Sequence, residues 1–229
     1  MWIQIDEEYL KYLKNNEDAR VPNQDYGKHR FKPFFKLFKL KGTDITYVSQ
    51  VSHPQKRHES IKPNIDFYKI YDDRNELSGV VNLNMMFPVL DKYIIEYDMK
   101  MIEERVAFKE GYDFTYYENR LNLYEDIINN VSPIKKNAIE VYTNKYTRND
   151  PRLSSRSLDF KQLEARGIEY ELSEILERDD ISVRASRRGF KVKIEEEQFN
   201  LTYSQVGYLN RFAEQMMNDL MIDNEFEME

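Results

Sequence analysis

The chain contains no cysteine among its 229 residues, and this absence excludes disulfides and cysteine-ligated zinc sites. Long apolar runs are also missing, since the longest, such as Met85-Met86-Phe87, fall far below the roughly 20 residues that span a bilayer. The N-terminus lacks a basic segment followed by a long apolar one, so it does not resemble a signal peptide. We therefore expect a cytoplasmic protein with no membrane partner.

Glycine and histidine are scarce. None of the 7 glycines lies in a phosphate-binding Gly-rich loop, which argues against nucleotide hydrolysis. The three histidines, His29, His53 and His58, show neither His-x-His nor His-Glu-x-x-His spacing. The acidic pairs 72–73 and 179–180 lie in turn-like segments and are interpreted as solvated turn carboxylates. We predict no metal and no cofactor.

Positive charge is in deficit overall, but its distribution is uneven. The formal net charge is −7, from 34 Lys and Arg against 41 Asp and Glu. Residues 1–70 hold 13 basic against 9 acidic residues, whereas residues 71–229 hold 21 against 32. Because salt screens distant charge over about 8 Å, a local basic patch can bind phosphate whatever the global sign. The asymmetry permits an anion site in the N-terminal third.

Hydrophobic periodicity predicts an α+β fold built from hairpins and amphipathic helices. Residues 158–221 suggest a C-terminal helix–hairpin–helix extension, and the polar segment 147–157 suggests a division into 1–150 and 151–229. The expected strands are 2–5, 34–41, 45–51, 66–71, 77–84, 93–101, 181–183 and 190–194, with Pro88 ending a short segment. The expected helices are 6–15, 113–130, 132–146, 158–178 and 204–221.

The stretch VSHPQKRHES at residues 51–60 gathers reactive side chains in a loop that follows a predicted strand. His53 and His58 can donate or accept a proton near neutral pH, and Lys56 and Arg57 can hold a phosphate. These are the parts needed to cleave RNA without a metal. A base takes the 2′-OH proton, the 2′-oxygen attacks the neighbouring phosphate, and an acid protonates the leaving 5′-oxygen. The same residues also fit an exposed, charged turn.

Four segments follow one another along the chain: YLKYLKNNEDARVPN from residue 9, YVSQVSHPQKRH from residue 47, GVVNLNMMFPV from residue 79, and the Tyr-rich helices at 112–146. Together they resemble the ToxN/AbiQ endoribonucleases, the toxins of type III toxin–antitoxin systems. The resemblance covers residues 1–150 and implies a ToxN/AbiQ-like RNase domain followed by an extension of unknown role. It implies a twisted, mainly antiparallel, open barrel-like sheet flanked by helices.

The resemblance also implies an activity and partners. It points to metal-independent cleavage of mRNA or phage transcripts that leaves a 2′,3′-cyclic phosphate, as in abortive infection against phage. It further implies inhibition by an RNA antitoxin made of pseudoknot repeats, in an assembly that can be a closed ring. A non-catalytic RNA-binding module on the same scaffold is the main alternative, and a protein-interaction domain is a third.

The resemblance also bears on the site residues, with two departures. The family's second serine is His53 in this sequence. The family's catalytic lysine is replaced by Gln55, whose amide supplies neither charge nor a proton. Lys56 can replace it after a small shift of the loop, His53 can take over the acid–base work, or activity can be weak or lost. We favour a combined role of His53 and Lys56. The candidate catalytic residues are Ser52, His53, Lys56 and His58, and the candidate RNA-binding residues are Tyr9, Tyr26, Lys28, Arg30, Lys32, Gln55, Arg57 and Asn82.

The extension carries one local basic cluster, Arg184, Arg187 and Arg188, on the predicted hairpin. Two interpretations fit it: a solvated hairpin, or a contact with RNA. Acidic residues dominate the rest of residues 151–229, so non-specific RNA binding is not their obvious task.

Overall fold

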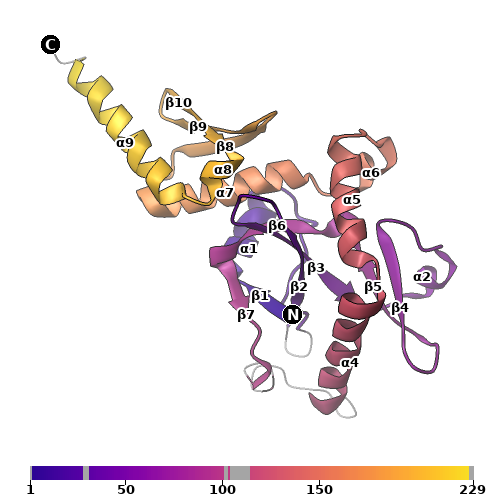
Figure 1. Ribbon diagram of the computed structural model, residues 1–229. Coiled ribbons are helices and arrows are strands. Elements are labelled where there is room, and N and C mark those ends of the chain that lie inside the picture. The colour runs from indigo at the N-terminus through magenta and orange to yellow at the C-terminus, as the bar shows by residue number, and fades with distance from the viewer. Residues whose placement is uncertain (1, 28–30, 101–102, 104–113, 227–229) are drawn as a thin grey trace.

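The computed structural model describes residues 2–27, 31–100, 103 and 114–226. A seven-stranded antiparallel sheet has the order β4-β5-β3-β2-β1-β7, with β6 paired to β3, and it is not closed into a barrel (Figure 1). This confirms the predicted α+β class and open, mainly antiparallel sheet. The strands are β1 (Trp2–Ile5), β2 (Phe34–Lys39), β3 (Ile45–Ser52), β4 (Phe67–Tyr71), β5 (Leu77–Asn82), β6 (Phe87–Leu90) and β7 (Ile94–Glu96).

Helices cover this sheet, and side-chain caps begin several of them. Asp6 accepts a hydrogen bond from the Tyr9 N–H at the start of the first helix, and Asp159 accepts one from Gln162. Pro133 immediately precedes α5, where a missing N–H does no harm. The helices are α1 (Glu7–Asn16), α2 (Lys56–Ser60), α4 (Phe114–Asp126), α5 (Ile134–Tyr146), α6 (Pro151–Arg156), α7 (Phe160–Leu176), α8 (Tyr203–Val206) and α9 (Leu209–Phe226).

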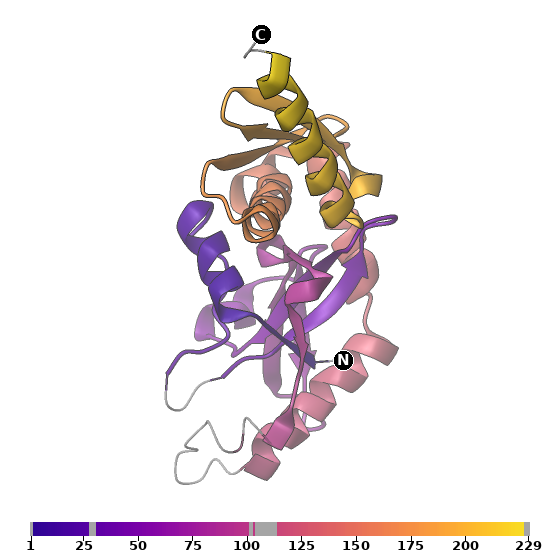
Figure 2. The same cartoon turned by 90° about the vertical axis from the view of Figure 1, so that its left-hand side faces the viewer.

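The C-terminal part forms a second, three-stranded antiparallel sheet. It consists of β8 (Ile181–Ser186), β9 (Gly189–Ile194) and β10 (Glu197–Thr202) in the order β10-β9-β8. The predicted hairpin is confirmed, but the third strand was not predicted. Figure 2 shows α7 lying between the large sheet and this smaller one, with α9 beside the smaller sheet.

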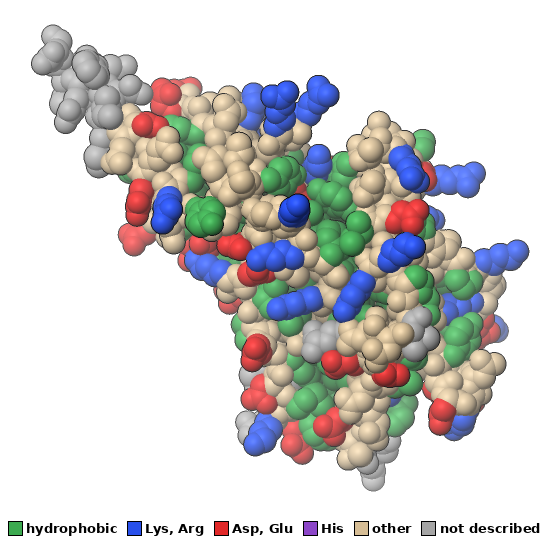
Figure 3. Space-filling model, viewed as in Figure 1, with side chains coloured by type: hydrophobic (Ala, Val, Ile, Leu, Met, Phe, Trp, Pro, Cys, Tyr) green, Lys and Arg blue, Asp and Glu red, His purple; other side chains and the backbone are tan. Residues whose placement is uncertain are grey.

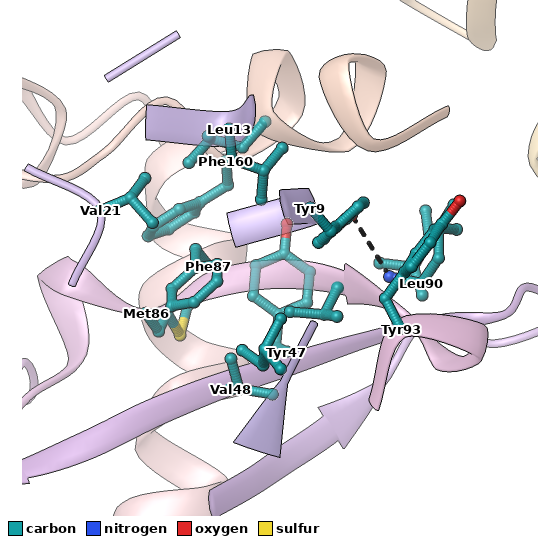
Figure 4. Packing of buried hydrophobic residues seen from close by; sticks show 14 of the residues in the cluster. Tyr9, Leu13, Val21, Tyr47, Val48, Met86, Phe87, Leu90, Tyr93 and Phe160 are labelled. Carbon is teal, nitrogen blue, oxygen red and sulfur yellow. Dashed lines mark hydrogen bonds between the residues drawn. The ribbon is translucent and has the colours of Figure 1, made fainter. Parts of the chain in front are cut away.

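Helix α7 and the large sheet share one core. Tyr9 of α1 stacks on Tyr93 with ring centroids 4.3 Å apart, and the Leu90 N–H donates to the Tyr9 hydroxyl at 3.4 Å (Figure 4). The buried carboxylate of Glu164 on α7 accepts hydrogen bonds from three hydroxyls, those of Tyr47, Tyr142 and Tyr203. Apolar packing thus continues across residue 150, and the division of the chain there stays a prediction.

Four local predictions were wrong. Residues 56–60, expected as loop, form α2, and residues 151–156 of the expected linker form α6. The strand expected over 93–101 is ordered as β7 for only three residues, and 101–102 lie outside the described residues. Pro88 does not end a segment but lies inside β6 opposite Tyr47, since an edge position needs no N–H from it.

Candidate active site

The predicted site lies where β3 ends beside β5. Val51 is paired with Val81 and Ser52 with Val80, and the pairing then stops. Residue 54 is a proline and has no N–H to extend the ladder. Because side chains alternate along a strand, Ser52 and Val51 lie on opposite faces of the sheet. At the end of β3, the Ser52 side chain therefore belongs to one face of the sheet and the Val51 side chain to the other.

The Ser52 face carries helix α2. Register places Lys69 and Phe67 of β4 on this face, opposite Val80 and Asn82 of β5. The His58 ring lies 5.7 Å from the Phe67 ring, and the Lys69 ammonium donates to the Glu59 carbonyl at 2.8 Å. The short helix that follows the reactive loop is thus docked on the surface that holds Ser52 and Asn82.

His58 fastens the start of α2. Its Nδ1 accepts the Gln55 N–H at 3.0 Å, and the His58 N–H donates to the Gln55 carbonyl at 2.7 Å. The side chain is 6% exposed, and burial, together with the nearby charges of Arg57 and Lys69, lowers the pKa of His58. A neutral ring that accepts at Nδ1 carries its proton on Nε2. His58 therefore holds the loop in shape.

A second loop borders the same face. Gln50, two residues before Ser52 on β3, donates from its side chain to the Asn23 carbonyl at 2.7 Å and to the Lys32 carbonyl at 2.9 Å. The loop carries Tyr26, which is 43% exposed and has the Lys32 ammonium 4.8 Å from its ring centroid. Ser52 therefore lies between this loop and α2. Lys28 and Arg30, also predicted to bind RNA, lie outside the described residues.

Four predicted groups on or next to the Ser52 face have no partner within the parts of the chain that the structure describes. The hydroxyl of Ser52 and the side-chain amide of Asn82 make no hydrogen bond there, and neither Lys56 nor Arg57 makes an ion pair. Lys56 and Arg57 are exposed, while Ser52 and Asn82 are half-buried. His53 and Gln55 are exposed as well. The four unpartnered side chains, those of Ser52, Asn82, Lys56 and Arg57, are available to a ligand.

The opposite face holds an arginine that we did not predict. Arg120 of α4 donates to the Ser78 carbonyl and, at 2.7 and 3.0 Å, to the Tyr124 hydroxyl, and it also donates to the Tyr116 hydroxyl at 3.1 Å. Ser78 lies on β5 two residues before Val80, which is the partner of Ser52 in the last residue pair of β3 and β5. No carboxylate pairs with Arg120 in the described part of the chain. A full positive charge thus stands beside the start of the reactive loop.

A sequence signal for Arg120 existed. Tyr116, Arg120 and Tyr124 are spaced by four residues, which places them in one line along a helix. Tyr124, at one end of this line, packs against Gly79 of β5. A Cβ on Gly79 would lie 2.6 Å from Val51 and 3.2 Å from the Tyr124 ring. The glycine therefore allows α4 to approach β5 closely.

Tyr9 requires a correction. It is 1% exposed and packs between Tyr93 and Tyr170 beneath α7, with no surface for a base. Its position on the buried stripe of α1, next to Leu10 and Leu13, accounts for this. Tyr9 supports the core and is removed from the candidate RNA-contacting residues.

The described residues also bear on metal binding and on membrane insertion. Among the described residues, no group of three or more His, Asp or Glu side chains lies close enough to hold a metal ion. No described helix is both long enough and apolar enough to cross a bilayer.

Comparison with known proteins gives a family. A family model described as toxin ToxN of the type III toxin–antitoxin system matches residues 1–167. A comparison with curated protein sequences finds no match.

Three solved structures share the fold. One is 22% identical, with a TM-score of 0.58 over 74% of this chain and 96% of its own; it concerns selective toxin inhibition by a non-coding RNA pseudoknot in bacterial type III systems. AbiQ, a lactococcal anti-phage endoribonuclease of the type III toxin–antitoxin system, is 19% identical, with a TM-score of 0.56 over 74% and 96%. The third, from a bacterial antiviral system regulated by a processed non-coding RNA, is 21% identical, with a TM-score of 0.53 over 71% and 94%.

Proposed function

Because the chain belongs to the ToxN family of type III toxin–antitoxin toxins, we propose that it is an endoribonuclease that a pseudoknot RNA antitoxin restrains. It cleaves RNA without a metal, by attack of the 2′-oxygen on the adjacent phosphorus. The P–O5′ bond breaks, and a 2′,3′-cyclic phosphate remains on one fragment. The observation that carries the proposal is the set of unpartnered groups around Ser52, between helix α2 and the loop that carries Tyr26 and Lys32. Substrates are mRNA or phage transcripts in the cytoplasm, and the toxin and its RNA can close into a ring.

Ser52 and the cations bind the scissile phosphate in this proposal. The Ser52 hydroxyl donates to a non-bridging oxygen or to the attacking hydroxyl, and Lys56 neutralises charge that develops on the phosphorane. Lys56 is the first residue of α2, one position after Gln55. Since Gln55 supplies its backbone to the helix start, a small offset along the loop lets Lys56 occupy the place of the family's lysine. Arg57 and Lys32 bind neighbouring phosphates.

His53 carries the proton transfer, rather than His58. The Nδ1 of His58 is engaged by the Gln55 N–H and the ring is buried, so protonation at that nitrogen would cost the hydrogen bond that forms α2. His53 is exposed and directly follows Ser52. Histidine is the side chain type best suited to proton transfer near neutral pH. It takes the 2′-OH proton or gives one to the leaving 5′-oxygen. Tyr26 stacks on a base, and Asn82 hydrogen-bonds RNA.

The test combines growth arrest with cleavage in vitro. His53→Ala and Lys56→Ala should each relieve growth arrest and slow cleavage on the order of 10²-fold or more, as expected for lost proton transfer or charge stabilisation. Lys41→Ala is the matched control, because Lys41 is also exposed but lies at the other end of the β2–β3 hairpin. The digest is run with a chelator, and the product end is identified as a cyclic phosphate by mass.

Two results decide against the proposal. Full toxicity of both variants would remove His53 and Lys56 from the site. RNA binding by the wild-type protein without any cleavage would favour the alternative function, a non-catalytic RNA-binding module, for which the Gln55 substitution is the supporting observation.

A further inference from the structure

The three-stranded sheet presents one apolar and one polar face. Alternating residues such as Val183, Phe190 and Leu201 are buried against α7 and α9. The intervening residues face away from this packing, and they contain cations and uncharged hydrogen-bonding groups but no carboxylate. These outward residues are Ser182, Arg184, Ser186, Lys191, Lys193, Gln198, Asn200 and Thr202.

One end of this face is strongly basic, and we call it the basic end. Arg184 lies directly opposite Lys191 in the β8–β9 register, and Arg187 and Arg188 form the adjoining turn. All four are exposed, and in the described part of the chain none makes an ion pair or a hydrogen bond through its side chain. Figure 3 shows basic side chains gathered at this end of the small sheet.

The opposite end shows that pairing is possible in this sheet. There Arg178 pairs with Asp180 at 2.7 Å and with Glu195 at 2.6 Å, and Lys193 pairs with Glu196 at 3.5 Å. The chain has 41 acidic residues to draw on. Cations directly opposite each other on a sheet repel, so leaving Arg184 and Lys191 unpaired costs stability. An unneutralised cluster of this kind complements a polyanion.

The side chains of this face limit which kind of polyanion it can bind. None of its outward residues is aromatic, so it offers no platform on which unpaired bases stack. Arginine forks and hydroxyls are instead suited to phosphate oxygens, which both strands of base-paired RNA present along their backbones. We propose that the basic end binds the phosphate backbone of base-paired RNA, independently of sequence. The inference rests on the proposed function, because that function makes RNA the partner.

The surface lies outside the part of the chain that matches the family. The family model ends at residue 167, within α7, and all three strands of the sheet follow it. The basic end is thus an addition to the toxin fold. In this proposal it is a second place, besides the site at Ser52, at which a structured RNA binds.

The test uses Arg187→Glu/Arg188→Glu in the full chain, because both residues lie in an exposed turn and not in the core. The probe is a labelled 20-base-pair 2′-O-methyl RNA duplex, which lacks the 2′-OH needed for cleavage. Binding is measured by anisotropy at several salt concentrations. The matched control is Lys11→Glu/Arg74→Glu, which makes the same change of charge at exposed positions on α1 and on the β4–β5 turn.

The turn variant should bind at least about 10-fold more weakly, and its slope of log affinity against log salt should fall by about 1.8, for two lost phosphate contacts at about 0.9 each. The control should stay within about twofold of the wild type. Equal losses in both variants, or no binding by the wild type, would overturn the inference. So would a turn variant that keeps duplex binding and loses binding to vesicles of anionic phospholipid.

Cleavage of a short single-stranded RNA separates this inference from the proposed function. The turn variant should cleave it at the wild-type rate, since the basic end is not part of the site at Ser52. If the wild type cleaves nothing, the proposed activity fails, and the duplex measurement still decides whether the basic end binds RNA.

Discussion

The contact of Gly167 with Tyr9 gives a stability prediction in which two effects of opposite sign compete. Gly167 lies in the middle of α7, where an alanine would stabilise the helix by about 0.8–1.0 kcal/mol. A Cβ at this position, however, would overlap the Tyr9 hydroxyl and lie 3.4 Å from the ring carbon that carries it. The outcome of Gly167→Ala depends on whether Tyr9 can move.

Tyr9 has little room to move. It is 1% exposed, stacks on Tyr93 and meets the edge of Tyr170 at a centroid distance of 5.5 Å. Overpacking in such a core costs about 1–3 kcal/mol. Set against the helix propensity, Gly167→Ala should destabilise the protein by about 1 kcal/mol, which corresponds to about 2–4 °C in Tm for a chain of this size.

Removal of the hydroxyl should reverse the sign. Tyr9→Phe alone costs about 0.5–1 kcal/mol, because the hydrogen bond from the Leu90 N–H is long, at 3.4 Å. In the Tyr9→Phe background the overlapping atom is gone and the remaining contact of 3.4 Å is ordinary, so Gly167→Ala should stabilise by about 1 kcal/mol. The cycle therefore predicts a coupling of about 2 kcal/mol.

Urea denaturation of the four proteins at one pH measures that coupling. The reasoning is refuted if Gly167→Ala stabilises both backgrounds equally, with a coupling under about 0.5 kcal/mol. The same proteins provide a functional control, because Tyr9→Phe should leave RNA cleavage unchanged if Tyr9 belongs to the core. A loss of activity at full stability would return Tyr9 to the RNA-contacting residues.

Two further predictions concern charge. Burial raises the pKa of the Glu164 carboxyl, so the folded protein binds a proton there more tightly than the unfolded chain and loses stability as pH rises above about 4.5. Glu164→Gln removes that dependence, so the unfolding free energy of the variant minus that of the wild type should increase between pH 4.5 and pH 8. A difference that stays constant with pH would contradict this prediction. Arg120→Met removes a cation beside the reactive loop, while Tyr124 still donates to the Ser78 carbonyl at 2.8 Å. The value of kcat/KM should fall about 10-fold or more, as for a lost charge-assisted hydrogen bond, and Arg120→Lys should partly restore it. Unchanged kcat/KM and unchanged salt dependence would exclude Arg120 from RNA binding.

Local signals explain which elements the sequence could predict. Asp6 caps helix α1, which has two glutamates in its first turn, and the β2–β3 hairpin alternates around a turn at 41–44, so both are visible in a short window. Helix α2 was missed because it has five residues, less than two turns, and shows no periodicity. Its start depends on the contact of His58 with Gln55 and Phe67, which no pattern of residue types displays.

Side-chain roles were harder to predict than elements, because burial decides them. Tyr9 and Tyr26 were equivalent as residue types, yet one lies on the buried stripe of a helix and the other in a loop that Gln50 anchors to β3. Strand β10 was missed because only Phe199 and Leu201 mark its inner face, and a run of three glutamates, Glu195 to Glu197, leads into it. Without that strand, the predicted hairpin is a narrow ribbon and not a sheet with a distinct outer face.

Helix α7 determines whether the added sheet can act together with the toxin fold. Glu169 accepts the Tyr12 hydroxyl of α1 at 2.6 Å and the Val183 N–H of β8 at 2.7 Å, so one buried carboxylate joins the two parts. Arg166 holds the same carboxylate at 2.7 Å. A flexible tether would let the basic end follow any RNA, whereas this linkage fixes the basic end relative to Ser52. A single structured RNA that contacts both places must therefore match a fixed separation, which makes RNA shape, and not base sequence, the basis of selection at the basic end.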